Sequence, residues 1–252
     1  DPKVSAVVIA VPPNLQPAIA LAAMKLGKAV FCEKPLAASL KNAQVLWKEA
    51  CRRKLPAMID FELFEIPSWL KARSVLKNSR IGRLSHAVIN WQLETYASRM
   101  GIDSWKTRTH EGGGALYSFA SHAFHYIENF LGPIRRLSCR LFLRDAVCLL
   151  NMEMVSGVMV SFSMGTNAFL GSGHRLEFYG DRGTLALHNT GPDHASGFVL
   201  SQGTRAFRKM KIISSEAAPK RNQDGRAAAV RPLAERFIRW IQTGQASHPS
   251  LK

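Results

Sequence analysis

The chain has 252 residues, 46% of them hydrophobic, and a formal net charge of +16. This length and apolar content can bury a sizeable core in one large domain or two small ones, which excludes a disordered or fibrous chain. No apolar stretch approaches the ~20 residues that a membrane-spanning helix needs, and no secretory leader is recognisable, so we predict a cytoplasmic protein without a membrane partner.

The positive charge raises the question of a nucleic-acid partner, because basic clusters attract phosphate groups. The clusters fall at residues 52–54, 135–136 and 205–211, in different parts of the chain, and no nucleic-acid-binding module surrounds them. A dinucleotide or an anionic sugar would also gain from positive potential. We therefore predict no nucleic-acid partner, while net charge alone does not choose among anionic ligands.

The first 61 residues alternate between apolar runs and amphipathic segments. Residues 4–11 form a run that ends at Pro12 and Pro13, and residues 29–32 form a second run after Gly27. Helices are predicted over residues 15–26 and about 40–53, the second with Ser39 as its N-cap, and a third strand over residues 55–61. This alternation predicts the later half of a doubly wound, parallel nucleotide-binding sheet.

The second apolar run ends in Glu33, Lys34 and Pro35. Ligands of doubly wound sheets bind beyond the carboxyl ends of the strands, so this lysine is placed where chemistry is expected. The proline fixes its own φ and restricts the backbone of Lys34, which aims the ammonium group from a stiff turn. The ordinary alternative is a solvated lysine at a strand end.

From about residue 62 the pattern changes. A helix is predicted over residues 66–78, and strands with tight turns follow at residues 87–96, 137–143, 147–154, 158–164, 176–179 and 184–187. Two more helices are predicted over residues 115–131 and 226–243 from apolar positions at helical spacing. We predict an α/β unit at residues 1–61, followed at residues 62–252 by an α+β unit with a large, mainly antiparallel sheet.

Glu33-Lys34-Pro35 after a strand, together with three glycines at residues 112–114 ahead of His122, resembles the Gfo/Idh/MocA family of NAD(P)-dependent oxidoreductases. The resemblance extends over nearly the whole chain. It implies a partial Rossmann domain at residues 1–61 and a substrate and oligomerisation domain at residues 62–252, in a homo-oligomer. Relatives open with a strand and a Gly-x-Gly-x-x-Gly turn and close with a further helix, so we expect a chain truncated at both ends.

The resemblance implies catalytic roles for Lys34 and His122. Oxidation of a sugar hydroxyl needs a base for its proton and a cation that steadies the alkoxide, and these are suitable residue types. In the family an aspartate lies four residues before the histidine, whereas Ser118 occupies that position here. Serine can share the helix face and orient a substrate, but it cannot carry charge. The alternative for His122 is a core histidine with a purely structural role.

The other site residues follow from the same resemblance. NAD or NADP is expected beside Pro12, Pro13, Asn14, Glu33, Lys34 and Pro35, while Gln16 takes the place of a histidine found in relatives. A carbohydrate substrate is expected beside Lys34, Trp105, Lys106, His122 and His125. No metal site is predicted, because the four cysteines lack metal-type spacing and are expected to be reduced core residues.

Two functions are compatible with this pattern. The first is a cytoplasmic oxidoreductase that transfers a hydride between NAD(P) and a hydroxyl or carbonyl group of a sugar, cyclitol or sugar nucleotide. The second is a non-catalytic relative that binds a sugar or a nucleotide, which Ser118 suggests. The sequence names neither the substrate nor the choice between NAD and NADP, because that choice is made near the second strand of the nucleotide fold.

Overall fold

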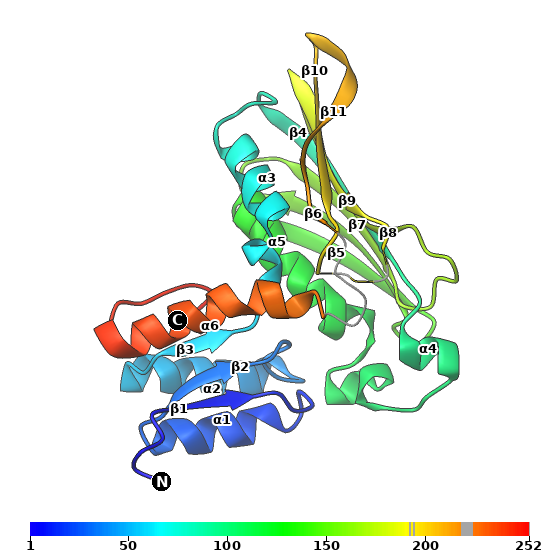
Figure 1. Ribbon diagram of the computed structural model, residues 1–252. Coiled ribbons are helices and arrows are strands. Elements are labelled where there is room, and N and C mark those ends of the chain that lie inside the picture. The colour runs from blue at the N-terminus through cyan, green and yellow to red at the C-terminus, as the bar shows by residue number, and fades with distance from the viewer. Residues whose placement is uncertain (192, 194, 218–223, 252) are drawn as a thin grey trace.

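The N-terminal part of the computed structural model, which describes residues 1–191, 193, 195–217 and 224–251, is a three-stranded parallel sheet. Its strands β1 (Ala6–Ile9), β2 (Ala29–Cys32) and β3 (Ala57–Ile59) lie in that order. α1 (Gln16–Lys25) and α2 (Leu40–Arg53) cover one face, and α6 (Arg226–Thr243) covers the other (Figure 1). The predicted partial Rossmann-like sheet is confirmed.

Apolar strands allow this small sheet to be buried on both faces. Val30 and Cys32 of β2 belong to one buried cluster with Leu46 of α2. On the other face, the rings of Phe31 and Phe237 lie 5.5 Å apart, which docks α6 on β2. The last helix of the chain therefore completes the core of the first sheet.

The C-terminal segment also joins this sheet. The N–H of Ile59 donates to the carbonyl of Pro249 at 3.2 Å, and the N–H of Leu251 donates to the carbonyl of Ala57 at 2.8 Å. Residues 249–251 thus run along the outer edge of β3. The division into domains at residue 61 remains a proposal. If it holds, α6 and residues 249–251 belong to the second domain in sequence but pack on the sheet of the first.

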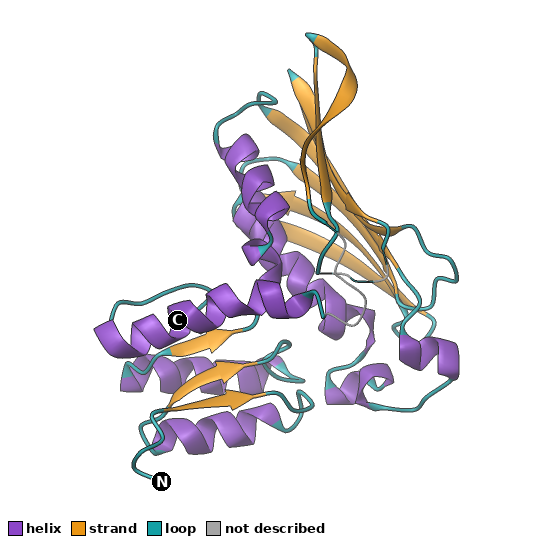
Figure 2. Cartoon of the chain, in the orientation of Figure 1, coloured by secondary structure: helices purple, strands orange, loops and turns teal. Residues whose placement is uncertain are grey.

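The larger sheet has eight strands in the order β11-β10-β9-β8-β4-β7-β6-β5, with β4 and β7 parallel and the other described neighbours antiparallel. The strands are β4 (Leu84–Gln92), β5 (Ile134–Phe142), β6 (Val147–Met154), β7 (Met159–Gly165), β8 (Gly173–Gly180), β9 (Gly183–Asn189), β10 (Val199–Thr204) and β11 (Phe207–Ser215). α3 (Pro67–Lys77) and α5 (Ser121–Leu131) pack on one face of this sheet (Figure 2). The predicted large, mainly antiparallel sheet is confirmed.

Short helices lie between β3 and β4 and between β4 and α5. They are η1 (Glu62–Glu65) after β3, α4 (Tyr96–Met100) after β4, the 3-10 turns η2 (Trp105–Thr107) and η3 (Thr109–Glu111), and a π-helix, η4 (Leu116–Ala120), that runs directly into α5. The predicted helix over residues 115–131 is therefore a π-turn followed by an α-helix. The strands β10 and β11 had no counterpart in the sequence prediction.

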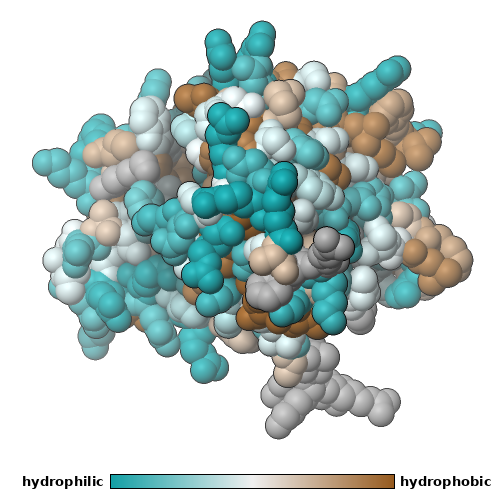
Figure 3. All heavy atoms as spheres, turned by 90° about the horizontal axis from the view of Figure 1, so that it is seen from above, coloured by the Kyte–Doolittle hydropathy of each residue, from teal (hydrophilic) through white to brown (hydrophobic). Residues whose placement is uncertain are grey.

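The second face of the larger sheet is not covered by any described helix. Val88, Leu149 and Met159 are 36%, 38% and 50% exposed, while their neighbours along the strands point into the core. Seen from above, the surface is mostly hydrophilic, with hydrophobic side chains exposed at several places (Figure 3). In the described part of the chain, no helix is both long enough and apolar enough to cross a lipid bilayer.

Candidate active site

The three parallel strands end at one edge, and the residues that follow them form the candidate site. The N–H of Glu33 donates to the carbonyl of Ile9, and the N–H of Asp60 donates to the carbonyl of Cys32, both at 2.9 Å. The charged residues after β2 and β3 are therefore held side by side just beyond the sheet. This is the edge at which doubly wound sheets bind their ligands.

Lys34 reaches from the end of β2 to η4, the π-turn that leads into α5. Its half-buried side chain donates a hydrogen bond from Nζ to the carbonyl oxygen of Ser118 at 2.9 Å, and the ammonium group lies 5.8 Å from the ring centre of Phe119. Burial lowers the pKa of Lys34 below that of an exposed lysine. The predicted lysine at a strand end is thus joined to the helix that carries His122.

The turn that carries Lys34 is fixed by Gln16, which is fully buried. Its Nε2 donates to the carbonyl oxygens of Glu33 at 3.0 Å and of Pro35 at 2.8 Å. The residue that takes the place of the relatives' histidine therefore stabilises the Glu33-Lys34-Pro35 backbone. Its Oε1 is buried without a hydrogen-bond partner among the described residues.

The π-turn sets the position of Ser118 and His122 at the start of α5. A π-helix widens the backbone spiral and often marks a functional site. Both side chains are buried, with 9% of Ser118 and 3% of His122 exposed. The imidazole packs edge-on against Phe61, with ring centres 5.7 Å apart. Lys34 therefore contacts the π-turn that carries Ser118, and His122 lies four residues further along the same run of helix.

Two carboxyl groups that the sequence analysis did not single out also lie here. Asp60 and Glu62 follow β3 and are 6% and 5% exposed. Burial raises the pKa of Asp60 to about 8, and the negative charges of Glu62 and Glu33 add to this effect. Burial also raises the pKa of Glu62. The same rule that identified Lys34 could have identified them, because they too are charged residues that directly follow a parallel strand.

The glycine-rich segment packs against the end of β1. A Cβ atom on Gly112, whose φ is +91°, would lie 2.7 Å from Cβ of Pro13. A Cβ atom on Gly113 would lie 2.2 Å from the carbonyl oxygen of Trp105. Side chains larger than hydrogen do not fit at these two positions. The absence of side chains therefore lets this backbone pack directly against Pro13 at Gly112 and against the Trp105 loop at Gly113.

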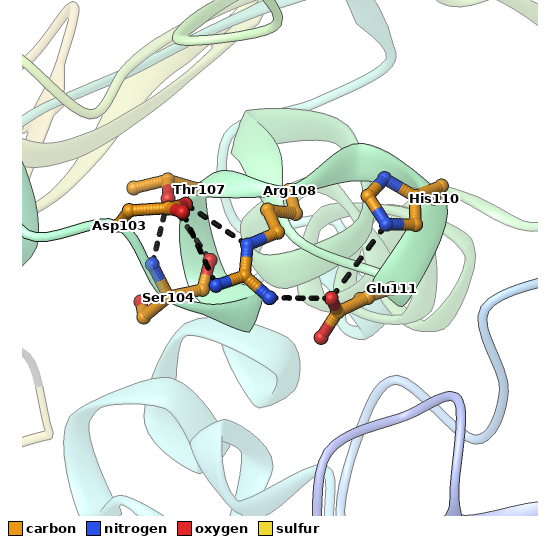
Figure 4. A network of polar contacts seen from close by, with 6 residues as sticks. All are labelled: Asp103, Ser104, Thr107, Arg108, His110 and Glu111. Carbon is orange, nitrogen blue, oxygen red and sulfur yellow. Dashed lines mark hydrogen bonds and ion pairs between the residues drawn. The ribbon is translucent and has the colours of Figure 1, made fainter.

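The loop after α4 is organised around Arg108 (Figure 4). The guanidinium group of Arg108 donates to both carboxylate oxygens of Asp103, at 2.9 and 3.2 Å, and to Glu111 at 2.6 Å. These hydrogen bonds of Arg108 stabilise the conformation of the loop. Lys106 is exposed, its ammonium group lies 5.8 Å from the ring centre of Trp105, and its positive charge further lowers the pKa of Lys34.

His125 lies one turn beyond His122 in a different environment. Its ring stacks on Phe61, with centres 4.4 Å apart and planes 11° from parallel. Burial, together with the charges of Arg73 and His248, lowers the pKa of His125 to about 4, so the ring is neutral at pH 7. No contact within the described residues joins His125 to Lys34, and its link to the site passes through Phe61.

A pocket of about 540 Å³ opens beside this cluster, at the end of β4. Its walls include Trp91, Tyr96, Arg99, Phe119, His174 and Asn189. Lys34 and His122 do not line it, but Lys34 lies against Phe119, and the His122 and Trp91 ring centres are 6.3 Å apart. The volume is in the range of pockets that hold small molecules. Among the described residues, no three His, Cys, Asp or Glu side chains are arranged as metal ligands.

Comparison with known proteins adds to this geometry. Residues 1–61 match the family model described as "Oxidoreductase family, NAD-binding Rossmann fold", and residues 69–186 match "GFO/IDH/MocA C-terminal domain". An uncharacterised oxidoreductase of Synechocystis is 27% identical over all of this chain and 74% of its own length. Inositol 2-dehydrogenase of Rhizobium meliloti is 25% identical over 92% of this chain and 79% of its own length.

The fold has solved counterparts as well. The structure of levoglucosan dehydrogenase in complex with NADH and L-sorbose superposes with a TM-score of 0.86 at 19% identity, covering 100% of this chain and 74% of that one. At this identity the likeness describes the fold alone. The chain spans about three quarters of the length of these relatives.

Proposed function

The chain belongs to the Gfo/Idh/MocA family of NAD-binding oxidoreductases, and from that premise we propose that it transfers a hydride between NAD(P) and a hydroxyl or carbonyl group of a sugar, cyclitol or sugar nucleotide. The observation that carries the proposal is the Lys34 ammonium group, held 2.9 Å from the carbonyl oxygen of Ser118 at the end of a parallel strand. The names of relatives support the substrate class, since they include an inositol dehydrogenase and a levoglucosan dehydrogenase.

We propose that the edge of the first sheet receives the nicotinamide end of the cofactor. Oε1 of Gln16, Oδ1 of Asp60 and Oγ of Ser118 are buried without hydrogen-bond partners in the described part of the chain, so polar groups remain for a bound molecule. When bound, the nicotinamide accepts or donates the hydride. We propose that this end is held by Pro12, Pro13, Asn14, Glu33, Lys34 and Pro35. No residue is assigned to the pyrophosphate, because no strand in this sequence is followed by a Gly-x-Gly-x-x-Gly turn.

Lys34 is proposed to hold the reacting hydroxyl group and to exchange its proton. Because burial lowers its pKa, it releases a proton more readily than an exposed lysine and can then accept one from a hydroxyl group. His122 is the second group proposed for this proton. Ser118 Oγ, which is buried and has no partner among the described residues, can orient the substrate through a hydrogen bond.

The pocket at the end of β4 is proposed to hold the rest of the substrate. Its walls combine aromatic faces with polar groups such as Asn189 and Arg99, which suits a polyhydroxylated molecule. Trp105 and Lys106 are proposed as contacts at its rim, from the loop that packs on the glycines. His125 is proposed to act on the substrate only indirectly, through the ring of Phe61.

The test uses the full-length protein with NAD or NADP and a panel of sugars and cyclitols. Formation of reduced cofactor with one of them, and its loss in Lys34→Ala, supports the proposal. Lys48→Ala is the matched control, since Lys48 is an exposed lysine on α2. No hydride transfer with any member of the panel, or full activity in Lys34→Ala, contradicts it.

A non-catalytic, ligand-binding relative is the second candidate, and Ser118 is the observation that favours it. Serine brings no negative charge to the helix at the position where relatives carry an aspartate. If this loss has silenced the enzyme, Ser118→Asp should create turnover where the natural protein has none. Robust turnover by the unmodified protein rejects this candidate.

We also propose that the chain forms a homo-oligomer and resides in the cytoplasm. The uncovered sheet face, with Val88, Leu149 and Met159 exposed, supports burial against a second copy. The four free cysteines support a reducing compartment. Light scattering after size-exclusion chromatography tests the first point, since a monomer at all concentrations contradicts it.

A further inference from the structure

The turn Asp60-Phe61-Glu62, here named the acidic turn, lies at the centre of the candidate site. It begins where β3 ends, and the N–H of Asp60 donates to the carbonyl of Cys32 at 2.9 Å, which places it next to the turn of Lys34. The ring of Phe61 packs edge-on against His122 and stacks on His125. One short segment therefore links the lysine strand to the histidine helix.

The two carboxyl groups of the acidic turn are buried but not neutralised by ion pairs. Asp60 is 6% exposed and Glu62 is 5% exposed. Oδ1 of Asp60 has no hydrogen-bond partner, and neither carboxyl group forms an ion pair with another residue that the structure describes. A buried carboxylate without a partner is costly, so such groups keep a proton to higher pH than usual. Glu65, in the same short helix, differs because it pairs with Arg236 at 2.6 Å.

The charges around the acidic turn come from three other elements. Glu33 and Lys34 follow β2, Arg226 begins α6, and Lys106 lies on η2. Glu62 and Glu33 oppose ionisation of Asp60, whereas Lys34 and Arg226 favour it. In return, the carboxylates of Glu62, Glu33 and Asp60 favour the charged form of Lys34, with Glu62 contributing most. The charges of the turn and of the lysine therefore act on each other among buried side chains, where charge interactions are stronger than in water.

We infer that the acidic turn sets the charge of Lys34: Asp60 and Glu62, two buried carboxyl groups held beside the lysine turn without ion pairs among the described residues, are positioning residues whose ionised forms favour the ammonium form of Lys34. The coupling acts through space, so no proton has to pass between the groups. Ser118 carries no charge, and the negative charge next to Lys34 therefore comes from the acidic turn and Glu33. The catalytic consequence rests on the proposed function, but the coupling itself can be measured without substrate or cofactor.

The first experiment measures the pKa of Lys34 by nuclear magnetic resonance in the full chain with isotope-labelled lysine, with Lys34→Arg used to assign the signal. We expect Glu62→Gln to lower this pKa, because the largest charge that favours the ammonium form is removed. Asp60→Asn should lower it less. Glu65→Gln, the matched control with an ion-paired carboxylate, should leave it unchanged. An unchanged or raised Lys34 pKa in Glu62→Gln overturns the inference.

The second experiment follows the protonated carboxyl group by infrared spectroscopy. A carboxylic-acid band should be present at neutral pH, fade as the pH rises through about 8, and be missing from Asp60→Asn. In Glu62→Gln the same band should fade at lower pH, because a neighbouring negative charge is gone. A merely structural role would not move this midpoint, and a band absent from the natural protein at pH 7 contradicts the inference.

The two proposals fail in different ways. If Glu62→Gln shifts the Lys34 pKa but no hydride transfer is found, the inference holds and the proposed enzyme activity is wrong. If hydride transfer is found but the Lys34 pKa does not shift in Glu62→Gln, the enzyme activity holds and the inference is wrong. Circular dichroism melting curves of each variant establish that the measured chain is folded, and the infrared result on the natural protein needs no variant that might misfold.

Discussion

The ends of β2 and β3 both deliver charge to the same site, yet the protein holds the two ends differently. Beyond β2, Gln16 fixes the backbone with two hydrogen bonds, and the Lys34 ammonium group has a carbonyl partner at 2.9 Å. Beyond β3, Asp60 keeps Oδ1 buried without a partner among the described residues. The hydrogen bonds beyond β2 fix the direction of the Lys34 side chain, while the Asp60 carboxyl group beyond β3 is left able to gain or lose a proton.

This difference suggests a division of work within one site. A group that must point at a reacting atom needs a rigid backbone and a hydrogen bond that orients it. A group that changes its charge near neutral pH needs burial and nearby charges that shift its pKa into that range. A strong ion pair would instead keep a carboxyl group ionised at neutral pH. On this view Lys34 contacts the substrate and the acidic turn sets the state of Lys34.

Removal of the oriented group should have the largest effect. Lys34→Ala is expected to lower kcat by about 10²–10⁴-fold, the range typical of a positioned acid or base. Lys34→Arg should not restore activity, because a guanidinium group cannot release its proton and has a different shape. The measurement is the steady-state rate of cofactor reduction by the full-length enzyme. An equal loss of kcat in Lys34→Ala and in the exposed control Lys48→Ala would show that Lys34 has no special role at the end of β2.

Removal of the titrating group should instead change the pH dependence of stability. The pKa of Asp60 is about 8 in the folded chain against 3.8 for an ordinary aspartate, so between roughly pH 4 and 8 the folded state holds a proton that the unfolded state has lost. The free energy of unfolding should therefore fall as the pH rises, by up to about 1.4 kcal/mol per pH unit from this group. In Asp60→Asn this contribution is absent.

The check is the thermal midpoint of unfolding, measured from pH 4 to 9. Relative to the natural protein, Asp60→Asn should gain stability steadily up to about pH 8 and no further. Asp103→Asn is the control, because Asp103 is an exposed carboxylate whose pKa is lowered by Arg108. A constant loss of stability at every pH in Asp60→Asn would mean that the residue is only structural.

The end of β1 extends the comparison, since it is held by shape rather than by charge. Gly112→Ala should cost about 1–3 kcal/mol of unfolding free energy, because φ is +91° and the new Cβ would lie 2.7 Å from Cβ of Pro13. Gly101→Ala, at φ +60° with no atom within 4 Å of its Cβ, should cost less, about 1 kcal/mol. Urea unfolding of both variants measures the difference, and equal losses would show that the contact with Pro13 is unimportant.

The sequence predicted best where one local rule decides the structure. β6 (Val147–Met154) and α6 (Arg226–Thr243) occur at the predicted residues, and the Ser39 side chain caps α2 by accepting the N–H of Asn42 at 3.3 Å. Lys34 lies at the end of a parallel strand as expected. In each case an apolar period, a capping residue or a proline specifies the local backbone without help from distant segments.

The parts that were missed depend on distant contacts. β10 and β11 are rich in polar residues and form because they pair with each other and with β9, which local pattern does not reveal. The π-turn has the same apolar spacing as an α-helix. The pKa values of Asp60 and Glu62 are raised mainly because the surrounding elements bury them, and the pocket combines the end of β4 with residues much later in the chain, such as Phe119, His174 and Asn189. The role of Arg108 in the loop depends instead on its side-chain hydrogen bonds to Asp103 and Glu111.

The most direct test of the account follows one atom. Full-length protein is mixed with NAD(P) and a sugar that carries deuterium on the reacting carbon, and the recovered nicotinamide is examined by mass spectrometry. Deuterium should be found in the nicotinamide with the natural protein and almost none with Lys34→Ala, while both proteins bind the cofactor. Binding of cofactor and sugar without any transfer of deuterium by the natural protein would contradict it.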